Sequence, residues 1–261
     1  MTQETISENV DWIDNINLDL GYDLPELYSG SDIASSALTG KQESMSLLAG
    51  KMLIITSPEL TAQQLADVQN SQLLCQLVAN KQFDDIKQPY EWYNEFRKRM
   101  SAVGWLKRGD FHDEYKITEA RYTLSGLVIK ILESLISGPD PTKIATTVKK
   151  AIDKITQFAK EGHPRAEIFS HATTSVSTYS FAMGYAYPGP QGAQFDMAFF
   201  SVKMGRSVTN ALVATFESQD TETNAHQVAM QLNESFYANK ARKKVLDKLG
   251  DKTKEIDDWP I

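Results

Sequence analysis

Residues 175–204, SVSTYSFAMGYAYPGPQGAQFDMAFFSVKM, decide the fold class of this chain. From Tyr179 to Tyr187, large side chains alternate with small or polar ones. A period of two with aromatic enrichment is typical of a β-strand. Two prolines and two glycines within 187–192 favour a turn, and 194–204 has the composition of a second strand. The sequence therefore predicts a long antiparallel hairpin.

After this hairpin the chain stays poor in charged residues up to Phe216, and its last part has the pattern of a helix. VTNALVATFE, residues 208–217, predicts a third strand, so that three strands form an antiparallel meander. Thr223-Asn224 predicts the cap of a helix from about Ala225 to Leu249, whose basic second half complements the helix dipole. Between Ala166 and Phe216 four of 51 residues are charged, as expected for a sheet covered by helices on both faces.

Upstream of the sheet, the pattern predicts a short strand and two helix hairpins. KMLIIT at 51–56 is an apolar run of strand type, and Ser57-Pro58-Glu59 has the composition of a helix start. Residues 60–103 are predicted to be a helix pair. Apolar stripes at 124–135 and 140–159, separated by Gly138-Pro139, predict the second hairpin.

Charge and composition divide the chain into three parts. Its 261 residues include 27 basic and 34 acidic side chains, and the acidic balance disfavours nucleic acid as a partner. Residues 1–50 hold nine carboxylates and one lysine, which fits either a loosely structured arm or an irregular segment laid over the core. We expect this acidic arm at 1–50, a single α/β (α+β) domain at 51–250 and a frayed tail at 251–261.

Chemistry-bearing motifs do not emerge from the sequence. It contains no glycine-rich phosphate loop, no nucleophile elbow and no metalloprotease motif, and its four histidines lack metal-ligand spacing. Cys75, the single cysteine, lies on an apolar helix stripe, which favours a buried and inert thiol. We expect no enzymatic activity, no cofactor and no metal. The polar start lacks the features of a signal peptide, so we expect synthesis in the cytoplasm as a soluble protein.

The order of these elements resembles a known family. SGLVIKILESLISGPDPTKIATTVKKAIDKITQF, together with the strands from 175 to 220, is similar in order and spacing to the Cyt-type cytolytic δ-endotoxins. Evf-type bacterial virulence proteins are a second candidate, and in that group cysteine acylation would fall on Cys75. The Cyt-type resemblance implies a single domain in which helix hairpins wrap a sheet of long antiparallel strands, followed by a C-terminal helix, and the Evf-type proteins are similar in size and α/β character.

The resemblance implies a toxin or virulence protein that binds membrane lipid and perturbs the membrane by inserting its long strands to form a pore, with a homo-oligomer on the membrane. Release to act on target-cell membranes would follow. The alternative is a non-lytic virulence cargo or scaffold that binds a lipid or a protein. Carried over by position, the candidate insertion residues are Tyr179, Phe181, Met183, Tyr185, Phe195, Met197, Phe199, Leu212 and Val213.

Overall fold

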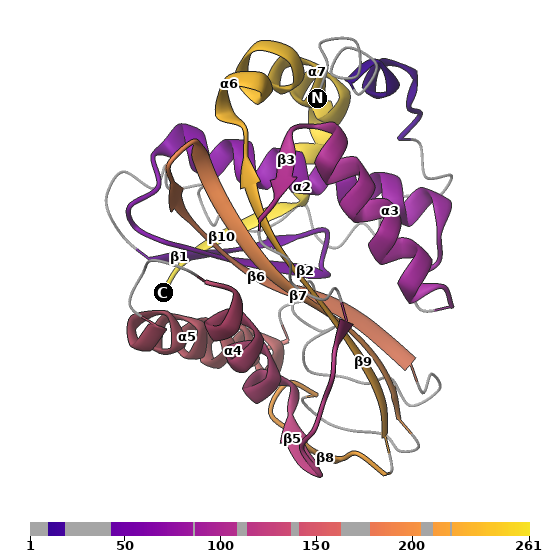
Figure 1. Ribbon diagram of the computed structural model, residues 1–261, viewed down its shortest axis with the longest axis vertical. Helices are drawn as coiled ribbons and strands as arrows, with labels where there is room; N and C mark the ends of the chain where they lie inside the picture. Colours follow the sequence, from indigo (N-terminus) through magenta and orange to yellow (C-terminus); the bar gives the residue numbers. More distant parts are fainter. Residues whose placement is uncertain are drawn as a thin grey trace.

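The computed structural model describes residues 10–18, 43–85, 87–108, 114–136, 141–162, 178–204, 211–219 and 221–261. A large, mostly antiparallel sheet lies between two layers of helices (Figure 1). In spatial order its strands are β10 (Ile256–Pro260), β1 (Ser44–Leu48), β2 (Met52–Thr56), β6 (Thr178–Gly189), β7 (Gly192–Met204), β9 (Thr221–Leu232) and β3 (Trp105–Lys107). Strand β4 (Glu114–Tyr115) also pairs with β9, and β5 (Arg121–Thr123) pairs with β8 (Thr215–Glu217) as a separate ribbon.

Two helix hairpins cover the sheet, as the sequence predicts. On one face lie α2 (Ala62–Gln82) and α3 (Pro89–Ala102), and on the other lie α4 (Leu124–Leu135) and α5 (Pro141–Lys160) (Figure 1). The C-terminal helical region adds α6 (Glu234–Phe236), a π-helical turn (Tyr237–Ala241) and α7 (Arg242–Leu249), then a 3-10 helix (Gly250–Glu255). The predicted α/β class with a C-terminal helix is confirmed.

Helix α2 begins four residues later than its proline suggests. Thr61 forms a capping box, in which its Oγ1 accepts from the Gln64 N–H at 3.1 Å and Gln64 Oε1 accepts from the Thr61 N–H at 3.1 Å. Ser57 instead starts a turn, since its carbonyl accepts from the Leu60 N–H at 3.2 Å. The reciprocal cap at Thr61 satisfies more backbone donors than Ser57-Pro58 can, so the helix starts there.

The hairpin of β6 and β7 is tighter than its proline and glycine content predicts. Strand pairing continues to Gly189↔Gly192, so the turn is reduced to Pro190-Gln191. Further along the same pair of strands, Gly184 permits a close approach, because a Cβ at that position would lie 2.4 Å from the Phe195 ring. Glycine here lets the large Phe195 side chain cross the neighbouring strand.

Each face of the sheet contributes to its own apolar core. Phe181, Met183 and Tyr185 of β6 pack in the core on the α4–α5 side. Phe195, Met197 and Phe199 of β7 pack in the core on the α2–α3 side. Side chains alternate along a strand, and the register Tyr185↔Asp196 places the odd residues of β6 and the even residues of β7 on one face.

The predicted third long strand at 208–217 is wrong for the described residues 211–214, and 208–210 lie outside the described part. Residues 211–213 form a turn, and 215–217 form the short β8, outside the main sheet. The third long strand is β9, where the sequence predicts the start of the terminal helix. Residues 225–232 are mostly Ala, Gln, Met, Val and Leu, which suit a helix; pairing with β7 along Thr221–Gln231 overrides that preference.

The two ends of the chain enter the fold more than the predicted arm and tail suggest. β1 lies within 1–50 and its five residues are buried, while β10 of the tail pairs with it along Ser44↔Pro260 to Leu48↔Ile256. Residues 10–15 are helical, and the buried Val10, Ile13 and Leu18 pack on the α2–α3 side. These short stretches become ordered through tertiary contacts with distant parts of the chain. A count of charged residues does not detect such contacts. The rest of the predicted arm, 1–9 and 19–42, lies outside the described residues.

Candidate functional site

A buried charged cluster lies inside the sheet, on its α4–α5 face. Asp196 of β7 is fully buried, and its Oδ1 accepts from Arg108 Nη2 at 2.5 Å. Its Oδ2 accepts from the Tyr187 hydroxyl at 2.9 Å, and Arg108 Nη2 also donates to that hydroxyl oxygen at 2.8 Å. One carboxylate therefore connects β6, β7 and the residue that follows β3. We call these residues the Asp196 cluster.

The electrostatics of this cluster are dominated by burial. Removal of the carboxylate from water raises the pKa of Asp196 to about 6, against the opposite effect of the Arg108 charge and the hydrogen bonds from Arg108 and Tyr187. The Arg108 side chain retains 16% exposure, whereas that of Asp196 has none. Burial therefore shifts the pKa of this carboxylate from its ordinary value toward neutral pH.

The candidate insertion residues fall on both faces of the sheet. Phe181, Met183 and Tyr185 lie toward α4–α5, and Phe195, Met197 and Phe199 lie toward α2–α3. The sheet thus buries large apolar side chains on both sides, and the apparent single large face of β6 does not extend across β7. Tyr179 lies in β6 opposite Val202, and its side chain is outside the described part.

Leu212 and Val213 are separate from the other candidate insertion residues. They lie in the turn before β8, where the Leu212 carbonyl accepts from the Ser125 N–H at 2.9 Å. Leu212 is buried, whereas Val213 is 46% exposed. They are therefore surface-turn and helix-contact residues, not part of a long strand.

Cys75 lies in the middle of α2 with no exposed surface. Burial in this apolar core raises the pKa of its thiol, which disfavours the reactive thiolate. Of the four histidines, His226 of β9 is described, and it stacks on Tyr93 of α3 with ring centroids 4.9 Å apart. Within the described residues, no group of three or more His, Cys, Asp or Glu side chains is arranged to hold a metal ion.

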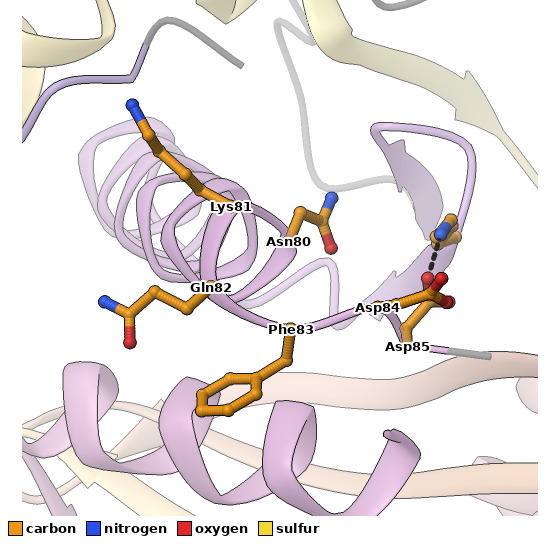
Figure 2. A pocket seen from close by; sticks show the side chains of 7 residues that line it. Asn80, Lys81, Gln82, Phe83, Asp84 and Asp85 are labelled. Atoms are coloured by element: carbon orange, nitrogen blue, oxygen red, sulfur yellow. Dashed lines mark hydrogen bonds and ion pairs between the residues drawn. The ribbon is translucent and has the colours of Figure 1, made fainter. Parts of the chain in front are cut away.

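A polar pocket of about 360 Å³ lies where α2 ends, next to the β1–β2 turn (Figure 2). Its charged groups are already engaged: Lys51 Nζ lies 2.5 Å from Asp85 Oδ1, and Lys81 Nζ donates to the Asn17 carbonyl at 2.6 Å. Asp85 also accepts from the Ser180 hydroxyl. The polar groups of the pocket therefore connect the end of α2 to the β1–β2 turn and to β6, and we assign them a structural role.

Comparison with known proteins gives no match: no protein-family model, no curated protein and no solved structure is similar to this chain. Among the helices that the structure describes, none combines the length and apolar character needed to cross a membrane.

Proposed function

We propose that this protein perturbs membranes by inserting the meander of β6, β7 and β9, and that the helix layers cover these strands in the closed form. The observation that carries the proposal is strand length. The three strands have 12, 13 and 12 residues, and about 9–11 residues suffice for a strand to span the apolar part of a bilayer. Each of the three strands is about twice as long as a usual strand, which has about five or six residues.

The two faces of this meander differ in a way that suits insertion. On the α2–α3 side, Phe195, Met197 and Phe199 lie beside Val228 and Met230 and form a continuous apolar surface. The opposite face is mixed: besides the apolar side chains of β6, it carries the polar side chains Gln194, Asp196, Gln227 and Gln231. We assign the first face to lipid and the second to a water-filled interior, since uncompensated polar groups are disfavoured in lipid.

The α2 layer is held to the sheet partly by polar contacts. Gln69 Nε2 donates to Ser46 Oγ at 2.8 Å, and Gln76 Nε2 donates to the Leu48 carbonyl at 3.2 Å. Gln72 is fully buried, and neither amide atom has a hydrogen-bond partner among the described residues. An unsatisfied buried polar group disfavours the closed packing by about 1–3 kcal/mol, which lowers the barrier to moving this layer.

Dye release from liposomes tests the proposal. The full chain should release an encapsulated dye in proportion to protein concentration, while the same protein denatured by heat should not. Absence of release across lipid compositions and pH values from 5 to 8 would contradict the proposal. Lipid binding without release would instead support the alternative of a non-lytic scaffold.

A further inference from the structure

Arg108 connects the edge of the sheet to its inner strands. It directly follows β3, and its backbone N–H donates to the Ala229 carbonyl of β9 at 2.8 Å. Its guanidinium extends past β9 to the Asp196 carboxylate of β7, at 2.5 Å, and to the Tyr187 hydroxyl of β6, at 2.8 Å. One side chain of the edge is therefore bonded to the two strands that form the central hairpin.

We propose that the Asp196 cluster is a proton-operated latch, which ties the β3 edge to the meander at neutral pH and releases it on acidification. The inference rests on the proposed function, because release of the edge is the step that would free β6, β7 and β9 for insertion. It identifies acidic pH as the condition that promotes that step.

The groups that face Asp196 define its titration. From the edge comes Arg108; from β6 come Tyr187 and Tyr185, the latter directly opposite Asp196 in the register. From β9 the opposite residue is Ala229, and the buried side of α4 is entirely apolar. Because Arg108 is the cation that holds the charged carboxylate, protonation of Asp196 removes the ionic part of this contact.

Protonation also removes the charge that this part of the hairpin would carry through the apolar layer of the membrane before its polar face reaches a water-filled interior. Asp196 is the sole Asp, Glu, Lys or Arg between residues 178 and 202. A carboxylate is far more costly than a neutral acid in an apolar environment. Burial raises the pKa of Asp196 to about 6, above its ordinary value of 3.8, so proton uptake favours the folded sheet over the unfolded chain. Release of Arg108 while Asp196 stays covered removes groups that lower this pKa, so protonation also favours the released arrangement over the latched one without unfolding the protein.

Hydrogen exchange in the absence of membranes tests the latch directly. After correction for intrinsic rates, the amides of 105–108 in the full wild-type chain should lose at least tenfold protection between pH 7.5 and pH 5. Asp196→Asn, which is neutral at both values, should show the low protection at both. Asp258→Asn, a change to an acid on β10 at the far edge, should retain the wild-type response. Equal protection of the wild type at both pH values would overturn the latch.

A second variant covers the case in which Asp196→Asn does not fold. The Tyr187 hydroxyl stabilises the charged carboxylate, so Tyr187→Phe should move the midpoint of the exchange transition to higher pH. An unchanged or lower midpoint would contradict the latch.

Dye release then separates the latch from the proposed function. With a midpoint near pH 6, the protonated fraction of Asp196 rises about thirtyfold from pH 7.5 to 5, and wild-type release should rise accordingly. Release by the wild type that does not depend on pH would overturn the latch and leave membrane perturbation standing. A pH-dependent exchange transition without release would leave the latch standing and contradict membrane perturbation.

Discussion

At the scale of single residues, the buried charge of Asp196 in an apolar strand is the feature on which the proposed pH response depends. Asp196 is visible in the sequence as an interruption of QFDMAFF, but its partners are not. Arg108 lies 88 residues away in sequence, in an edge segment without periodicity, and it reaches Asp196 only because β3 pairs with β9. The sequence therefore indicates the unusual carboxylate, whereas its cationic partner can be identified only from the fold.

The pH dependence of stability follows from this residue. Because the pKa of Asp196 is raised when folded, its protonated form stabilises the fold below about pH 4, and that stabilisation is lost as the pH rises through about 6. The loss is on the order of 3 kcal/mol. The unfolding free energy of Asp196→Asn minus that of the wild type should therefore be larger at pH 7.5 than at pH 4.

Urea unfolding of both proteins at the two pH values measures this difference. A wild-type minus variant difference in unfolding free energy that stays constant across this range would show that Asp196 does not titrate as its burial requires.

At the scale of elements, α2 combines helix-forming sequence with a polar buried side. Gln69, Gln72 and Gln76 are all buried on a helix that packs against the sheet, and the apolar periodicity of 60–103 predicts the helix without revealing this polar contact. Helices and the β6–β7 hairpin follow from local pattern. Strand β9 does not, because its helix-compatible residues are held extended by pairing with β7.

Two glutamines of α2 provide a matched pair of substitutions. Gln72→Leu removes amide atoms that lack partners among the described residues, so it should raise the unfolding free energy by about 1–3 kcal/mol and slow dye release. Gln69 bonds to Ser46 Oγ at 2.8 Å and to Asp258 Oδ1 at 2.7 Å, so Gln69→Leu should lower the unfolding free energy by a similar amount.

Chemical denaturation and liposome leakage measured on both variants check this prediction. If both substitutions raise the unfolding free energy, or both lower it, the hydrogen bonding of these glutamines does not determine how stably α2 packs on the sheet.

At the scale of the whole molecule, the meander is flanked by β2 on one side and by β3 and β4 on the other, and its long boundary with the sheet is the one to β2. β2 and β6 pair in parallel from Met52↔Ala182 to Thr56↔Ala186, whereas the other strand pairs described for this sheet are antiparallel. The β1–β2 hairpin and β10 lie on the far side of this seam (Figure 1). For β6, β7 and β9 to enter a membrane together, the pairing of β2 with β6 has to break.

A disulfide across this seam tests membrane insertion most directly. Leu53 and Met183 are register partners, and neighbouring strands lie about 4.8 Å apart, within the range of about 4.4–6.8 Å that disulfides bridge. Met45 and Ile55, partners across β1 and β2, give a control lock that does not involve the meander. Both pairs of cysteines would be placed in a Cys75→Ala background.

The measurement is dye release from liposomes by each locked protein, oxidised and then reduced. We predict that the Leu53–Met183 lock abolishes release when oxidised and that reduction restores it, while the Met45–Ile55 lock leaves release unchanged. Undiminished release by the oxidised Leu53–Met183 protein would contradict insertion of the meander, because the strands would then have acted without leaving the sheet.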